Sequence, residues 1–319
     1  MINLRYHIVS LVAVFLALGL GIVMGSTVID RVTVDALNNR LDEVQRSVGA
    51  IRAENGRLGD QVQQGQDFAV TTRDQLLRGH LRNIPVMVVA VAGIDRGPVD
   101  EVREALVSAQ ATMEGTIWFT SKMRLASDSD VRALATALDL PVDRPEVVRR
   151  QALAKVAAAR ETAAVESSPL AALQASGFLT YEGPPTTTST SGGQASPSVT
   201  APSSLAALPL ANTRYLVVSG AGAEVGDDVV AVPLVQAYAQ ASSRVVAAES
   251  GVDTEGGRAV FVGLLRGDIA SGRLSTVDNL ESPMGQTAAV LALEDLGVPR
   301  FGHYGVGPGA QRILPAQTP

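Results

Sequence analysis

The glycine-rich turn GAGAEVG, residues 220–226, is the segment whose residue types and spacing come closest to a ligand-binding motif. It follows a predicted strand and precedes a predicted helix, a position in which backbone N–H groups can surround a phosphate. The spacing GxGxxxG lacks the Lys-Ser/Thr ending of a P-loop, and the carboxylates of Asp227 and Asp228 would repel phosphate at the start of the helix. We therefore expect an ordinary turn here, and also at the similar segment AGIDRG, residues 92–97.

Histidine and cysteine are frequent catalytic residues, and this chain has few histidines and no cysteine. The histidines are His7, His80 and His303, and none has a Ser, Asp or Glu at the spacing of a recognised catalytic triad. Cysteine is absent, which excludes disulfides, thiolate nucleophiles and cysteine-ligated metals. We predict no catalytic residue, no cofactor and no metal site, and hence a protein that is not an enzyme.

The charge balance argues against nucleic-acid binding. The 319 residues carry a net charge of −6 and the sequence pI is about 5.2. Lysine is almost absent, so the sequence does not predict a basic face that would bind a phosphate backbone.

Residues 8–29 form an uncharged, mostly apolar run near the start of the chain. About twenty apolar residues are enough for a helix to cross a bilayer, and charged residues flank the run on both sides, with Arg5 before it and Asp30 after it. A cleaved secretory signal is the alternative, but its apolar region usually spans about 7 to 15 residues. We predict an uncleaved anchor at residues 1–30 in the plasma membrane, with the amino terminus in the cytoplasm and the bulk of the chain outside.

Small residues recur every fourth position within this anchor. They are Ala13, Ala17, Gly21 and Gly25, and they form a stripe on one helix face. Such stripes let two helices approach closely in lipid, although glycine and alanine are also common in membrane helices that do not pair. The stripe is thus a candidate self-association surface.

A heptad pattern follows the anchor and predicts a coiled coil over residues 31–82. Apolar residues alternate at spacings of three and four, which is the signature of a left-handed two-stranded coil. The one polar member, Asn55, falls at an a position, where a pair of asparagines fixes the register at some cost in stability. The seam consists of Val34, Leu37, Leu41, Val44, Val48, Ile51, Asn55, Leu58 and Val62.

Three partners remain open for this seam. Two strands that leave one pair of membrane helices are parallel by construction, so a parallel homodimer is the first. A coil with another cell-envelope protein is the second, because interior glycines at residues 49, 56, 59 and 65 weaken the helix by about 1 kcal/mol each, and because facing positions such as Arg40 and Gln45 are not complementary in charge. Packing of the helix against its own chain is the third.

From residue 83 onward the pattern changes to short apolar runs that alternate with helical segments, which predicts a mostly parallel α/β sandwich domain with helices on both faces of the sheet. We expect one domain in two parts, residues 83–182 and 213–319, separated by a disordered Ser/Thr/Pro-rich insert at 183–212. Expected strands are residues 85–92, 115–120, 215–219, 244–248, 259–265 and 274–277. Expected helices are residues 98–111, a segment capped by Asp128 or Ser129, 145–165, 228–242, and 283–296 with Ser282 as its cap.

Three segments together resemble an actinobacterial family named after the copper transporter MctB. They are the opening MINLRYHIVSLVAVFLALGLGIVMGS, the heptads that follow it, and STVDNLESPMGQTAAVLAL at residues 275–293. The resemblance covers nearly the whole chain. It implies a mycolic-acid or related envelope, a single amino-terminal span, and either copper efflux through an outer-membrane channel or a role in cell division and control of cell-wall hydrolases.

The residues favour the second of these implied roles. Copper(I) is held by clustered soft ligands, whereas the methionines here are scattered singly. A membrane barrel would need many segments of about ten residues with alternating polarity, and the expected strands are short and interleaved with helices. We therefore predict a non-enzymatic scaffold or regulator of the cell envelope, with copper efflux or homeostasis as the alternative. The methionines are Met1, Met24, Met87, Met113, Met123 and Met284.

Overall fold

The computed structural model describes residues 4–159, 168–184, 205, 212–242, 244–251, 261–267, 273–298 and 300–316. The side chains of residues 26–36 lie outside this description, as does most of the predicted insert. Contacts divide the chain into two compact units, Met1–Gln66 and Asp67–Pro319. Each unit is treated by itself.

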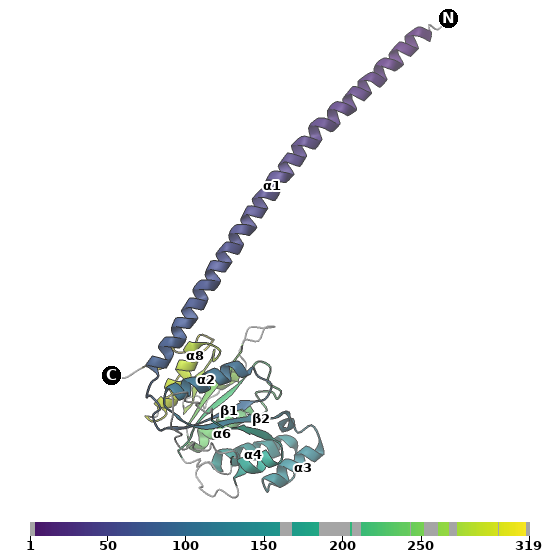
Figure 1. The fold of residues 1–319 in the computed structure, drawn as a ribbon. Coiled ribbons are helices and arrows are strands. Elements are labelled where there is room, and N and C mark those ends of the chain that lie inside the picture. The colour runs from purple at the N-terminus through teal and green to yellow at the C-terminus, as the bar shows by residue number, and fades with distance from the viewer. Residues whose placement is uncertain are drawn as a thin grey trace, which may run out of the picture. The chain divides into compact units, whose positions relative to one another are not determined.

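Helix α1 (Leu4–Leu76) contains both the predicted anchor and the predicted seam (Figure 1). Within it, Arg5–Gly25 is long and apolar enough to span a membrane, as a single-pass protein requires. The helix ends six residues before the predicted limit at 82, and Gly79 follows in a left-handed conformation, φ 86°. The helical state of the seam is thus confirmed, while its pairing into a coiled coil stays a prediction.

The second unit is built on one seven-stranded sheet with the order β3-β2-β1-β4-β5-β6-β7. All neighbouring strands are parallel except β2 and β3, which are antiparallel. The strand order reverses between β1 and β4. This confirms the predicted mostly parallel α/β architecture. The strands are β1 (Pro85–Val91), β2 (Thr112–Phe119), β3 (Leu179–Glu182), β4 (Arg214–Gly220), β5 (Val245–Ser250), β6 (Ser275–Val277) and β7 (His303–Tyr304).

Helices cover both faces of this sheet (Figure 1). Helices α2 and α8 pack on one face, and α3 to α7 supply the apolar side chains of the other. Their bounds are α2 (Arg96–Ser108), η1 (Ser121–Arg124), α3 (Asp128–Ala137), α4 (Pro145–Ala158), α5 (Pro169–Ala175), α6 (Ala231–Ser242), α7 (Phe261–Arg266) and α8 (Pro283–Asp295).

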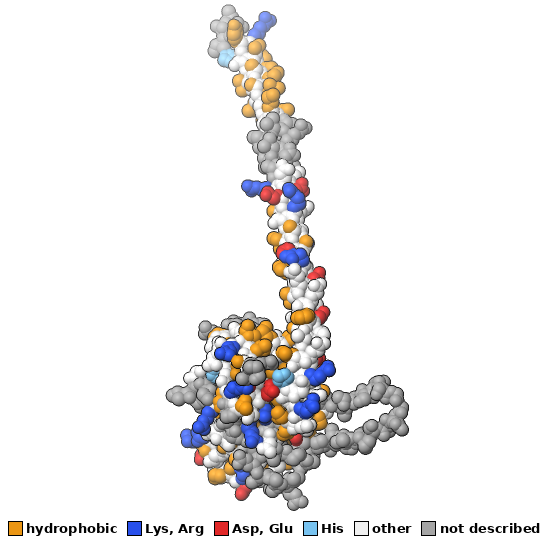
Figure 2. Space-filling view, turned by 90° about the vertical axis from the view of Figure 1, so that its left-hand side faces the viewer, with side chains coloured by type: hydrophobic (Ala, Val, Ile, Leu, Met, Phe, Trp, Pro, Cys, Tyr) orange, Lys and Arg blue, Asp and Glu red, His pale blue; other side chains and the backbone are white. Residues whose placement is uncertain are grey.

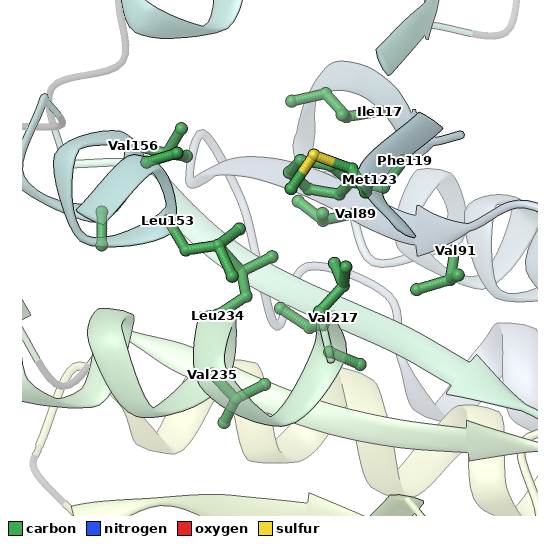
Figure 3. Close-up of a cluster of buried hydrophobic side chains, with 14 of the residues drawn as sticks. Val89, Val91, Ile117, Phe119, Met123, Leu153, Val156, Val217, Leu234 and Val235 are labelled. Atoms are coloured by element: carbon green, nitrogen blue, oxygen red, sulfur yellow. The ribbon is translucent and has the colours of Figure 1, made fainter. Parts of the chain in front are cut away.

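Strand β1 explains why the sheet needs cover on both sides. Successive side chains of a strand point to opposite faces, so Met87 and Val89 enter one hydrophobic cluster while Val86 and Val88 enter the other. All four are essentially inaccessible to solvent. Figure 3 shows the first cluster, where Val89 lies beside Met123. The continuous apolar run in the sequence is thus the mark of a central strand.

One expected strand was wrong. Residues 261–266 form helix α7 rather than part of a strand at 259–265, and residues 259–260 lie outside the described part of the chain. The carboxylate of Glu249 accepts hydrogen bonds from the backbone N–H groups of Phe261 and Val262, at 3.1 and 2.9 Å. These bonds satisfy two of the free amides of a first helical turn. A contact from another strand therefore overrides the local pattern.

Smaller differences concern where elements begin. Ser127, not Asp128 or Ser129, caps α3, since its hydroxyl accepts from the Asp130 amide at 3.2 Å. Helix α6 begins at Ala231, three residues after the expected start. Strand β3 and helix α5 were not anticipated. The cap of α8 by Ser282 is confirmed, with its hydroxyl accepting from the Gly285 amide at 3.1 Å.

Candidate interaction surface on helix α1

The small-residue stripe of the apolar segment is open to its surroundings. Ala13, Ala17 and Gly21 are exposed and Gly25 is half-buried. A Cβ atom placed on Gly21 or Gly25 would meet nothing within 4 Å. Spacing by four residues puts these positions on one helix face. The face is therefore free to receive a close-packed helix.

The heptad seam is exposed along its described length. Its apolar side chains are 39 to 60% exposed, with Val48 the most covered and Leu37 the least. Asn55 is exposed as well. The side chain of Val34 lies outside the described residues, although its backbone is helical. Figure 2 shows hydrophobic side chains on the surface of this helix, interspersed with charged ones below the apolar segment.

Charged groups beside the seam interact within the helix. Arg57 and Glu54 form an ion pair at 2.5 Å with both side chains more than half exposed. The Arg57 hydrogen bond lowers the pKa of Glu54. Arg46 donates to the backbone oxygen of Asp42 at 3.2 Å. These local bonds stabilise the helix only weakly, because they are exposed to solvent, and they leave the apolar side chains without cover from this unit.

Within the second unit, the end of α1 is held by a buried polar network. Arg73 is 5% exposed and donates a hydrogen bond from Nη1 to Oε1 of Gln286 in α8. Gln286, which is 1% exposed, donates from Nε2 to Glu101 at 2.6 Å and to the Leu280 carbonyl at 3.2 Å. Leu77, one turn later, is completely buried in the cluster beneath α2 and α8. The last turns of α1 are therefore an integral part of the α/β unit.

The glycine-rich turn after β4 is filled by protein backbone. Gly222 has φ 86° and packs against the backbone of Gly93, whose φ is 97°. The Glu224 amide donates to the Ala92 carbonyl at 2.7 Å, and the Ala221 amide donates to the Ser250 carbonyl at 3.2 Å. The reversal of strand order at β1 and β4 is the usual ligand crevice of such sheets. Here the amides of Ala221 and Glu224 donate instead to carbonyls at the ends of β5 and β1.

Three carboxylates, Glu249, Asp227 and Asp278, lie at the same edge of the sheet. The sequence pointed to Asp227 only as a residue that would repel phosphate, and it did not predict this group. The pKa of Glu249 is raised to about 7, mainly by burial and also by the negative charges of Asp227 and Asp278, although the two amide hydrogen bonds lower it. Burial likewise raises the pKa of Asp227, which accepts a hydrogen bond from Ser219. No local spacing could have found this group, because its members come from different strands and loops.

Asp278 is neutralised by a buried partner. Arg266 donates to Asp278 Oδ2 at 2.8 Å, and both side chains are less than 10% exposed. Arg266 also donates to the carbonyls of Tyr304 and Pro308. Asp278 accepts from the amides of Val306 and Gly307. This pair ties α7 and β6 to the segment that follows β7.

Two of the three histidines, His80 and His303, have ordinary hydrogen-bond partners. His80 Nδ1 lies 2.7 Å from Glu294 Oε2, and His303 Nδ1 lies 2.9 Å from the Thr276 hydroxyl. Burial lowers the pKa of His303, and the charge of Arg266 lowers it further. His80 borders a hollow of about 450 Å³, whose described lining includes no Ser, Thr or Cys that could act as a nucleophile. The contact between His80 and Glu294 joins two residues that are 214 positions apart in the sequence.

Comparison with known proteins matches residues 1–315 to the family described as "Copper transport outer membrane protein, MctB". The chain belongs to the MctB family. Relatives named "Copper transporter MctB" occur in Mycobacterium tuberculosis strain H37Rv, at 25% identity, and in Mycobacterium leprae, at 26% identity. Both alignments cover 99% of this chain and all of the relative. The family resemblance seen in the sequence is thus confirmed.

The described methionines of this MctB-family chain lie in three kinds of surroundings: one core cluster, the edge of the other cluster, and the exposed surface. Met87 and Met123 are fully buried in the same hydrophobic cluster, where they fill the core. Met113 packs at the edge of the opposite cluster, and Met24 is exposed in the apolar segment. Among the described residues, no group of three or more His, Cys, Asp or Glu is arranged to hold a metal ion.

Proposed function

We propose that this MctB-family chain is a non-enzymatic scaffold or regulator of the cell envelope, anchored by one helix and paired with a second copy through α1. The observation that carries the proposal is the exposed seam: apolar side chains recur at heptad spacing on a helix whose unit supplies no cover for them. The α/β unit would then be displayed outside the plasma membrane for an envelope partner, with the amino terminus inside.

Pairing is favoured by burial and by geometry together. Covering half-exposed Leu, Ile and Val side chains gains about 1 kcal/mol each, since full burial gains roughly 1.5 to 3 kcal/mol. The small-residue stripe would support the same pairing in lipid. Asn55 selects an in-register parallel arrangement, in which it meets its own copy. A coil with a different envelope protein would need another chain with a polar residue opposite Asn55.

Co-purification of two differently tagged full-length copies from membranes tests the proposal. The double variant I51E/L58E places like charges at facing d positions and should abolish recovery of the second tag. The control A53E/Q64E adds the same charges at outward-facing f and c positions and should leave recovery unchanged. Equal recovery for both variants would exclude pairing through this seam.

Copper handling is the second candidate, since relatives that align over their whole length are named copper transporters. The available metal ligands favour an indirect role in copper handling, because the chain has no cysteine and two of its methionines are buried in the core. Equilibrium dialysis of the full-length protein in detergent against copper(I) decides between a direct and an indirect role. Stoichiometric uptake would establish direct copper binding and would remove our argument against it.

A further inference from the structure

The last turns of α1, within the unit Asp67–Pro319, carry two different faces. One face is packed against the α/β unit: Ala69 is half-buried, Arg73 is 5% exposed and Leu77 is fully buried. The other face is open, with Phe68 72% exposed and Leu76 42% exposed. A phenylalanine this exposed leaves most of a large apolar surface in water.

The packed face determines which side of the helix remains open. Arg73 is bound to Gln286, and Gln286 is bound in turn to Glu101 and to the Leu280 carbonyl. Rotation of the helix to cover Phe68 would break this buried network and withdraw Leu77 from its cluster. The unit therefore cannot cover the open face with its own side chains without losing an existing core contact.

The open face keeps the heptad register of the seam. With Val62 at an a position, Phe68 falls at g, Thr72 at d and Leu76 at a. Every a, d and g position from 58 to 76 is uncharged, whereas charged residues occupy other positions, among them Asp60, Asp67 and Asp74 at f. The uncharged residues on the open face are Leu58, Gln61, Val62, Gly65, Phe68, Thr72, Gln75 and Leu76, and the remaining a position, Ala69, lies on the packed face.

An uncharged face of this kind suits a second copy of the same chain. In a parallel two-stranded coil each a or d residue lies close to its own counterpart, so a charge at those positions would meet an identical charge. Where Gly65 leaves space at a d position, Phe68 from the neighbouring g position can cover it. Phe68 and Leu76 then gain burial that the α/β unit does not give them.

We infer that the paired interface of α1 continues beyond Val62 into the last turns of the helix. There Phe68, Thr72 and Leu76 of two copies cover one another. This inference rests on the proposed pairing of α1. Its consequence is that residues of the unit Asp67–Pro319 take part in the pairing themselves.

Single-cysteine variants of the full-length chain test the inference, because the natural sequence has no cysteine. T72C lies on the open face, and T71C is its matched control: both threonines are exposed, they are adjacent, and Thr71 falls at an outward c position. L58C reports pairing through the heptad seam, of which Leu58 is a member. Each variant is oxidised with diamide in membranes, and Trp118 fluorescence of the purified protein reports that the α/β unit is folded.

We expect disulfide-linked dimers of L58C and T72C, with several times more dimer for T72C than for T71C, because a disulfide needs the two Cα atoms within about 7 Å. If L58C forms dimers while T72C and T71C give equal, low dimer yields, the inference is overturned and the proposed pairing through the heptad seam stands. Failure of L58C itself to form dimers would overturn both.

Discussion

Arg73 donates a hydrogen bond to Gln286 across 213 positions of sequence, and both side chains are almost completely buried. This bond holds the last turns of α1 against α8 within the α/β unit. The strength of this contact can be measured directly.

Replacing Arg73 by methionine tests that strength. R73M keeps most of the apolar volume but leaves Oε1 of Gln286 buried without a donor, which costs about 1 to 3 kcal/mol. Urea unfolding of the full-length protein in detergent, followed by the fluorescence of Trp118, the single tryptophan, gives the free energy of unfolding. R78M, at an exposed residue just after the end of α1, should change that energy by less than about 0.5 kcal/mol. Equal effects of the two variants would show that the Arg73 network is unimportant.

The buried pair of Arg266 and Asp278 should be among the most sensitive sites in the α/β unit. D278N removes one charge and leaves the Arg266 guanidinium buried without compensation, so we expect a loss of about 3 to 5 kcal/mol. E146Q is the control, because the Arg144–Glu146 pair is exposed at 75% and 59% and 3.6 Å long; such pairs contribute at most about 1 kcal/mol. The same urea assay measures both. A loss from D278N no larger than that from E146Q would contradict the burial argument.

Glu249 should make the α/β unit less stable as pH rises. Its pKa is about 7 in the folded chain and near 4.5 as a free side chain, so the folded state binds the extra proton between these values. Stability contributed by this group is therefore fully present at low pH and is lost as pH rises from about 4.5 to 7. Unfolding energies measured from pH 5 to 8 should fall in the wild type and fall less steeply in E249Q. Parallel pH profiles of the two proteins would count against this assignment.

Two glycines should respond to alanine in opposite directions. In G93A the new Cβ would collide with the backbone of Gly222 and Glu224, at a residue whose φ is 97°, so we expect a loss of more than about 2 kcal/mol. Gly263, inside α7, would meet nothing within 4 Å, and G263A should stabilise by roughly 0.5 to 1 kcal/mol. Thermal unfolding of the full-length protein in detergent compares them. A neutral G93A would mean that the loops after β1 and β4 are not closely packed.

The sequence predicts this fold where one segment carries the whole signal. The run at residues 85–92 identifies β1, because a strand covered on both faces must be apolar at every position. Ser282 identifies the start of α8, because a cap depends only on residues three apart. The heptads identify a helix and its exposed side.

Prediction fails where a distant residue decides. Helix α7 depends on the carboxylate of Glu249 at the end of another strand, so the local β-branched pattern misleads. Strand β3 is four residues long and pairs antiparallel at the edge of the sheet, too short for periodicity to reveal. The partner of Arg73 is unpredictable for the same reason, since nothing near residue 73 indicates α8.

Self-pairing of α1 is the central claim, and the periodicity of cross-linking tests it most directly. Single cysteines placed in turn at each position from 48 to 62 in the full-length chain, oxidised in membranes, should give disulfide dimers that peak at residues 48, 51, 55, 58 and 62, a repeat of about 3.5 residues. Dimer yields that are uniformly absent, or that show no preference for these positions, would contradict the account.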